Sequence, residues 1–117
     1  MNIAVVGSRN FNDYELLKSS VEEFVVEKTP EHITVISGGA KGADSLAERL
    51  ASEKNYDTLI FYPDYKKYGR SAPLIRNTLI IENADVVFAF WDGISRGTKD
   101  SISKAEKLNK EVRIHRF

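Results

Sequence analysis

The segment SGGAKGAD, at residues 37–44, carries the residue types that bind phosphate. It lies between an apolar run and an amphipathic pattern typical of a helix, so its backbone amides would open onto a helix N-terminus, which carries partial positive charge. It matches neither a Walker A loop nor the GxGxxG pattern, and without a ligand it would form a tight strand-to-helix turn. The candidate ligand contacts in this segment are Ser37, Gly38, Gly39, Lys41, Gly42 and Asp44.

A second glycine-containing segment, WDGISRGTKD at residues 91–100, precedes the last helical pattern. Thr98 could cap that helix and contact a phosphate, and Asp92 could hold a ribose hydroxyl or a base edge. Trp91 could stack on a base, or it could be a half-buried aromatic residue at a sheet edge. Two such loops at adjacent strand ends can enclose one ligand. The candidates here are Trp91, Asp92, Gly93, Ser95, Gly97 and Thr98.

Two arginine-bearing segments supply the remaining candidates, which are Gly7, Ser8, Arg9, Phe11, Arg70, Arg76 and Asn77. Arg9 could bind a phosphate or carboxylate with its guanidinium, and Phe11 could offer a stacking face. Alternatively, Arg9 is a surface charge and Phe11 packs against the first helix. Arg70 and Arg76 lie around the start of the third long helical pattern, where they could bind phosphate or be solvated charges.

Glycine and charge point to the same edge of the predicted fold. All seven glycines fall just after a predicted strand, and ligands of open α/β sheets bind outside the carboxyl ends of the strands. The segments at that edge (7–12, 37–44, 63–77 and 91–100) hold eight basic and four acidic residues, although the chain is neutral, with 17 of each. A local positive charge on a neutral body favours a small phosphorylated ligand, and we do not expect an extended nucleic acid to bind.

Composition excludes several kinds of chemistry. The chain has no cysteine, so it has no thiolate nucleophile and no Cys-ligated metal. His32 and His115 lie at predicted strand ends away from the glycine-rich edge, and we predict neither a metal site nor a cofactor. No apolar run reaches the roughly 18 residues of a membrane span. We expect a cytoplasmic protein without membrane contact.

The elements that position these residues follow from hydrophobic periodicity. Apolar runs predict strands at 3–6, 33–36, 58–62, 86–90 and 112–114. Helical spacing predicts helices at 13–28, from 43 to about 51, from Pro73 onward and around 102–108. In the third of these helices, the inner face is predicted to consist of Leu74, Ile75, Thr78 and Leu79.

Alternating strands and helices are typical of a parallel sheet covered on both faces. The expected fold is a Rossmann-like three-layer α/β/α sandwich with a parallel sheet of about five strands. Its 117 residues fit one domain, spanning 1–117. The longest irregular stretch, 63–72, is predicted to be a functional loop or a mobile lid.

Taken together and in order, the four motifs resemble the YspA/YpsA-related branch of the SLOG superfamily. Its wider relatives include the DprA DNA-processing proteins and the LOG phosphoribohydrolases, which activate cytokinins. The resemblance covers essentially the whole chain. It implies a Rossmann-like fold whose two glycine loops bind nucleotides or nucleotide-derived ligands, often as sensors or processors in bacterial stress and phage conflict.

The second loop departs from the LOG pattern, Pro-Gly-Gly-x-Gly-Thr-x-x-Glu, whose glutamate serves N-glycosidic cleavage. Gly97 and Thr98 align with it, but the glutamate position falls on Ser101. Asp100 is one residue out of register, which turns a helical side chain by about 100°. The resemblance therefore does not carry LOG catalysis over to this chain, and no catalytic residue is assigned from it.

Two functions remain open from the sequence. The first is a binding module that senses or sequesters a nucleotide-derived ligand. The alternative is a small nucleotide hydrolase that cleaves an N-glycosidic or phosphate bond, with Asp44, Asp92 or Asp100 as the general base. We also expect a homo-oligomer, because five strands in so short a chain leave apolar helix surface to cover.

Overall fold

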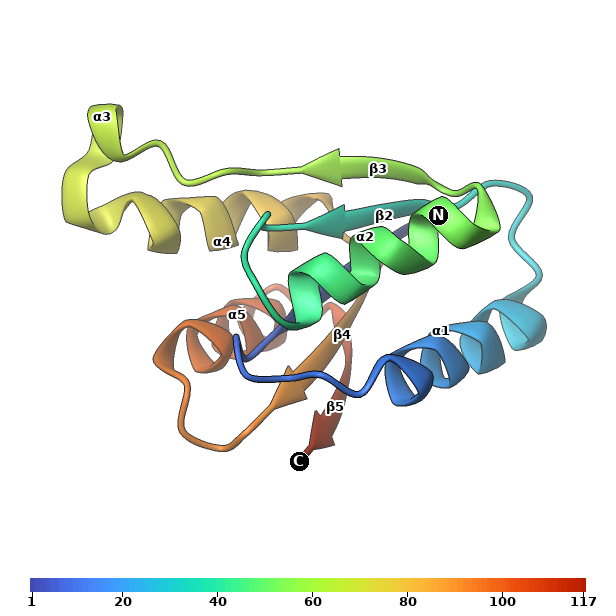
Figure 1. Ribbon diagram of the computed structural model, residues 1–117. Coiled ribbons are helices and arrows are strands. Elements are labelled where there is room, and N and C mark those ends of the chain that lie inside the picture. The colour runs from blue at the N-terminus through green and yellow to red at the C-terminus, as the bar shows by residue number, and fades with distance from the viewer.

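The computed structural model describes all 117 residues, which form one five-stranded parallel sheet with helices on both faces (Figure 1). The strands are β1 (Asn2–Gly7), β2 (Thr34–Ser37), β3 (Asp57–Ile60), β4 (Val86–Trp91) and β5 (Glu111–Arg116). The helices are α1 (Tyr14–Lys28), α2 (Ala43–Lys54), α3 (Tyr65–Tyr68), α4 (Ala72–Asn83) and α5 (Arg96–Lys107), and a 3-10 turn, η1 (Gly69–Ser71), joins α3 to α4. The expected Rossmann-like α/β fold is confirmed.

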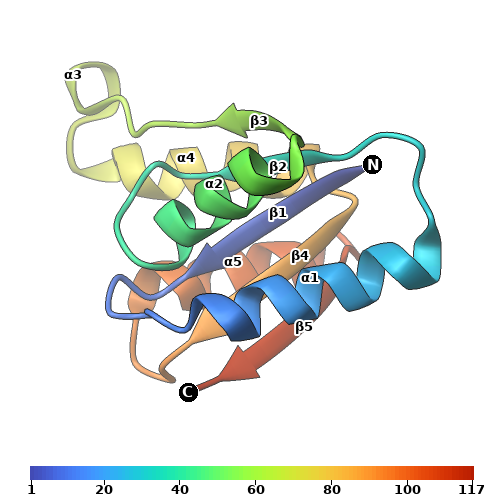
Figure 2. The ribbon, with the colours of Figure 1, turned by 45° about the vertical axis from the view of Figure 1, so that its right-hand side comes forward.

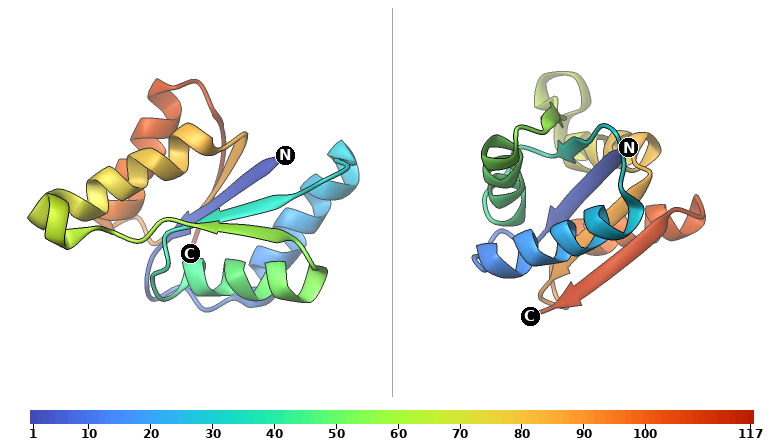
Figure 3. Two further views of the ribbon diagram at one scale, coloured as in Figure 1. Left: turned by 90° about the horizontal axis from the view of Figure 1, so that it is seen from above. Right: turned by 90° about the vertical axis from the view of Figure 1, so that its right-hand side faces the viewer.

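The strand order is β3-β2-β1-β4-β5, with β1 at the centre. Helices α1 and α2 cover one face of the sheet, and α4 and α5 cover the other (Figures 2 and 3). Ile3 and Val5 of β1 pack under α1 and α2, whereas Ala4 and Val6 pack under α4 and α5. Burial on both faces explains why the central strands are continuous apolar runs. None of the helices is both long enough and apolar enough to cross a bilayer.

The start of α1 has a side-chain cap, whereas the start of α5 has none. Asp13 caps α1, since its carboxylate accepts a hydrogen bond of 3.1 Å from the amide of Leu16. At α5 the N-cap residue is Ser95. Thr98, which the sequence offers as a candidate for this cap, lies inside the helix, where its side chain is buried. That shift frees Thr98 for the pocket described below.

The predicted inner face of α4 is wrong. Leu74 and Leu79 are 48% and 41% exposed, and the buried residues are Ala72, Asn77, Ile80 and Ile81. Two sets of apolar residues at helical spacing run along α4, offset by one residue: the predicted set includes Leu79, and the other includes Ile80. Packing selects the set with Ile80 and Ile81, which joins the core under β1 and β4.

The stretch 63–72, predicted to be irregular, is largely helical. It contains α3 and η1, and Asp64 caps α3 by accepting a 3.1 Å hydrogen bond from the amide of Lys67. The preceding strand stops at Ile60 instead of Tyr62, because its partner β2 ends at Ser37, which pairs with Ile60. The side chain of Tyr62 is therefore outside the sheet.

The loop after β1 packs directly on the turn that starts α2, and only glycine fits at the contact. Gly42 has φ 76° and ψ −127°, and a Cβ there would lie 2.4 Å from the carbonyl oxygen of Ser8. Residues with side chains avoid this backbone region. Gly42 therefore holds the two glycine-containing segments 7–9 and 37–44 in contact.

We expect Gly42→Ala to lower the free energy of unfolding by about 2 kcal/mol, which corresponds to a Tm drop of roughly 8 °C. Thermal unfolding measures this effect. The matched control is Gly97→Ala, where a Cβ would meet no atom within 4 Å and the Tm should hold or rise slightly, since alanine favours helix. An unchanged Tm in Gly42→Ala would contradict the contact.

Candidate functional site

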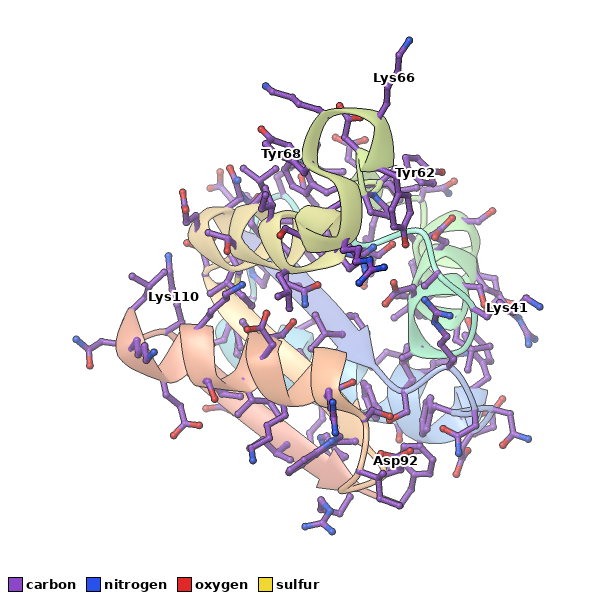
Figure 4. The ribbon with its side chains drawn as sticks, turned by 90° about the vertical axis from the view of Figure 1, so that its left-hand side faces the viewer. Lys41, Tyr62, Lys66, Tyr68, Asp92 and Lys110 are labelled. Carbon is purple, nitrogen blue, oxygen red and sulfur yellow. The ribbon has the colours of Figure 1, made fainter.

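A pocket of about 430 Å³ opens at the carboxyl edge of the sheet, at the end of β1. This central strand lies between β2 and β4, and the strand order reverses there. Figure 4 looks onto this edge, with α4 and α5 on one side and α2 on the other. In an open α/β sheet such a reversal of strand order leaves a crevice. The lining residues are Val6, Gly7, Ser8, Arg9, Asn10, Ala40, Asp44, Pro73, Leu74, Arg76, Asn77, Ile80, Ser95, Gly97, Thr98 and Ser101.

Arg76, on the first turns of α4, is the half-buried cation of the pocket. Its Nε donates to Asn77 Oδ1 at 3.0 Å, and its Nη1 donates to the carbonyl of Gly38. Burial lowers the pKa of the guanidinium, and the nearby charge of Asp44 opposes that shift. Arg76 forms no ion pair, and its remaining N–H groups have no protein acceptor. The pocket therefore contains a positioned guanidinium that can bind an anion.

Asp44 lies in the first turn of α2 and is 7% exposed. Its carboxylate accepts a 3.1 Å hydrogen bond from the amide of Ala40, which holds the glycine-rich loop over the helix start. Burial raises the pKa of Asp44, while that hydrogen bond and the charge of Arg76 act in the opposite direction. Asp44 is thus the buried acid of the pocket.

The second loop is organised by Asp92, whose carboxylate accepts hydrogen bonds from the amides of Ile94 (2.9 Å) and Ser95 (2.8 Å). These bonds lower the pKa of Asp92. The Ser95 hydroxyl lies 3.0 Å from both Asp92 Oδ2 and Ser8 Oγ, which ties the loop to the end of β1. Asp92 does not line the pocket, so the structure gives its carboxylate a loop-shaping role in place of the expected ribose contact.

The first turns of α5 present two hydroxyls to the pocket. Thr98 and Ser101 are 5% and 1% exposed, and neither hydroxyl hydrogen-bonds to another residue. Gly97 precedes them, with its backbone open to the pocket, and the first amides of a helix have no partner within the helix. This turn is held against α4 by Asn77, whose Nδ2 donates to Gly97 O (3.3 Å) and to Asp100 Oδ2 (3.2 Å).

Asp100 does not line the pocket. Its carboxylate lies 2.8 Å from Lys104 Nζ as well as accepting from Asn77. Ser101, at the position of the LOG glutamate, is the residue that lines the pocket. Of the three carboxylates considered as general base, only Asp44 borders the pocket.

The structure brings most of the predicted residues together. Those that line the pocket are Gly7, Ser8, Arg9, Asp44, Arg76, Asn77, Ser95, Gly97 and Thr98. Gly39 and Lys41 line a smaller hollow beside it with Arg9, Ala40 and Ser45, and Figure 4 shows Lys41 beside α2. Ser37, Gly38 and Gly42 belong to the first loop but do not line the pocket.

Besides Asp92, four predicted residues lie elsewhere. Phe11 is 3% exposed and stacks on Phe90 with ring centroids 4.7 Å apart, so it is a core residue and not a base platform. Trp91 is half-buried at the end of β4, and its Nε1 donates to the carbonyl of Ser95 at 3.1 Å. Gly93 lies against Arg116. Arg70 is exposed in η1, outside the pocket.

The residues that line the pocket without having been predicted are Val6, Asn10, Ala40, Pro73, Leu74, Ile80 and Ser101. Ser101 follows Gly97 by four positions, which places both on one face of α5, so the helical spacing could have identified it. Nowhere in the chain do three His, Asp or Glu side chains gather as metal ligands would.

One curated relative is the Gene 61 protein of Mycobacterium phage D29, which is 29% identical over 111 residues, covering 90% of this chain and 88% of the phage protein. Among solved structures, a protein designated TM1055 gives a TM-score of 0.67 at 23% identity, over 95% of this chain and 71% of its own. At that identity the structural likeness concerns the fold.

Two DprA proteins share the fold with a TM-score of 0.73, one from Helicobacter pylori (21% identity) and one from Streptococcus pneumoniae (18%). Each match covers 97% of this chain but only 64% and 49% of the respective DprA chain, so this chain spans half to two thirds of their length. The Helicobacter protein is described by its single-stranded DNA binding mode. This finding overturns our expectation that an extended nucleic acid would not bind, because overall neutrality does not exclude strand binding at a local basic edge.

The family model that describes the YspA, cpYpsA-related SLOG proteins matches residues 1–68, more than half of the sequence. The matched part includes the first two glycine segments, with Gly7, Arg9 and the loop 37–44. The chain therefore belongs to the YspA, cpYpsA-related SLOG family.

Proposed function

We propose that this protein binds a nucleotide or nucleotide-derived ligand, with a phosphate held at the carboxyl edge of the sheet. The observation that carries the proposal is the convergence on one pocket of three side chains that can donate hydrogen bonds to a ligand. These are the guanidinium of Arg76 and the hydroxyls of Thr98 and Ser101, each on a helix that the fold anchors. Such donors, together with the open N-terminus of α5, match the oxygens of a phosphate.

The dimensions of the pocket suit a small phosphorylated molecule. Its volume of about 430 Å³ lies within the range of roughly 300–1,000 Å³ for small-molecule sites. Pro73, Leu74 and Ile80 supply an apolar wall that could contact a base or a sugar. Arg9 at the rim is exposed and forms no ion pair, so it can add charge to the same ligand.

The biological role that we propose is sensing or sequestration of a nucleotide-derived signal in bacterial stress or phage–host conflict. Its support is membership of the SLOG family and similarity to a mycobacteriophage protein. The cytoplasmic location stays a prediction.

The first test is Arg76→Ala, with affinities for AMP, ADP, ATP and cyclic nucleotides measured by calorimetry. Hydrogen bonds to charged groups contribute roughly 1.5–3 kcal/mol, so the dissociation constant should rise about 10- to 150-fold. Arg96→Ala removes the same charge from the same edge outside the pocket, and it should change affinity less than about threefold. Equal effects of the two variants would contradict a specific contact.

A second candidate function, hydrolysis of the bound nucleotide, is favoured by the burial of Asp44 in the pocket and its raised pKa. If the protein is a hydrolase, Asp44→Asn should abolish turnover while the ligand still binds. Asp92→Asn and Asp100→Asn should retain turnover, because neither carboxylate borders the pocket. Chromatography of the incubated ligand measures this, and intact ligand after incubation with the unaltered protein would exclude the hydrolase.

Self-association is part of the proposal. Leu74 and Leu79 are exposed apolar side chains on α4, the helix that also carries Arg76, and a second copy could cover Leu79 near the ligand. We expect sedimentation at micromolar concentration to show an oligomer that Leu79→Lys dissociates. A monomer at that concentration would contradict this part of the proposal.

A further inference from the structure

The segment 62–70, which joins β3 to α4, combines exposed aromatic rings with exposed cations. Tyr62, Tyr65 and Tyr68 are 67%, 57% and 38% exposed. We call these three tyrosines, together with Lys66, Lys67 and Arg70, the tyrosine platform. All three cations are exposed, and none forms an ion pair. The one acid of the segment, Asp64, accepts the cap hydrogen bond of α3.

The platform adjoins the pocket through the first glycine loop. The ring of Tyr62 lies directly on Gly39, where a Cβ would approach its Cε1 to 2.4 Å. Gly39 also lines the hollow that contains Arg9 and Lys41, and the next residue, Ala40, lines the pocket. On its other side the platform runs through η1 into α4, whose Pro73 borders the pocket.

Figure 4 shows this arrangement from the carboxyl edge. Tyr62 and Tyr68 lie on opposite sides of the α3 turn, and Lys66 extends beyond it into solvent. Lys41 lies across the edge, next to α2. Exposed rings and cations thus occur together on this segment, at the same edge of the sheet as the pocket.

We propose that the tyrosine platform binds the bases of a single-stranded nucleic acid, one of whose nucleotides occupies the pocket. This inference rests on the proposed function and extends it from a single nucleotide to a strand. Aromatic side chains can stack on any base, and neighbouring cations can bind the phosphates of the backbone. Proteins that bind single strands without sequence preference combine these two contacts. A strand needs only a local track of positive charge, and the neutrality of the whole chain does not oppose it.

The test compares a fluorescein-labelled dT12 and an rU12 by anisotropy, with AMP binding measured by calorimetry in parallel. We expect at least one of the two strands to bind. The double variant Tyr65→Ala/Tyr68→Ala should weaken strand binding about 10-fold or more, since stacking contributes roughly 1–3 kcal/mol per base. Tyr65→Phe/Tyr68→Phe keeps the rings and should retain the affinity. AMP affinity should be unchanged in both.

Charge is tested separately by salt dependence. Lys66→Ala/Lys67→Ala should reduce the slope of log K against log salt by about 0.7 for each phosphate that these two lysines neutralise. Lys107→Ala, an exposed lysine in the last turn of α5, should leave the slope unchanged.

Two results would overturn the platform and leave the nucleotide proposal standing: AMP binds but neither strand does, or the tyrosine double variant binds strands as tightly as the unaltered protein. Loss of AMP binding in Arg76→Ala, with the platform variants unaffected, would support the pocket alone. If neither AMP nor a strand binds the unaltered protein, the proposed function fails as well.

Discussion

The central position of β1 is the constraint on which the site depends. Helix α1 connects β1 to β2 on one side of it, and α4 later connects β3 to β4 on its other side. Because these connections run in opposite directions from β1, they leave a crevice at the carboxyl edge. Because all strands are parallel, every strand-to-helix loop ends at that edge. The two glycine loops and the starts of α2, α4 and α5 are therefore brought together by topology, although they are far apart in the sequence.

Arg76 shows how the fold turns this crevice into an electrostatic site. A guanidinium that forms no ion pair is expensive to bury. Three groups offset part of that cost: the carbonyl of Gly38, the side-chain oxygen of Asn77 and the nearby charge of Asp44. Asn77 is in turn bonded to Gly97 and Asp100 at the start of α5. One short network thus connects both glycine loops to α4. An anion in the pocket would complete the pairing that the protein leaves open.

The predictable parts of this structure are those governed by local patterns. Apolar runs such as 3–6 and glycines after strands locate the sheet and its functional edge, and nine of the candidates at that edge line one pocket. The failures have tertiary causes. α4 carries two apolar stripes, and only packing decides that Ile80 is inside and Leu79 outside. Phe11 is taken into the core by Phe90, a residue almost eighty positions away.

The phosphate site between the two glycine loops can be tested by an amide chemical-shift titration of the isotopically labelled protein with AMP, with adenosine and with inorganic phosphate. If the two glycine loops hold a phosphate, AMP and phosphate will shift the amides of Gly38, Gly39, Gly97 and Thr98, and adenosine alone will leave these amides little changed. Shifts confined to the β5 edge or to the amino ends of the strands would contradict a phosphate site between the two glycine loops.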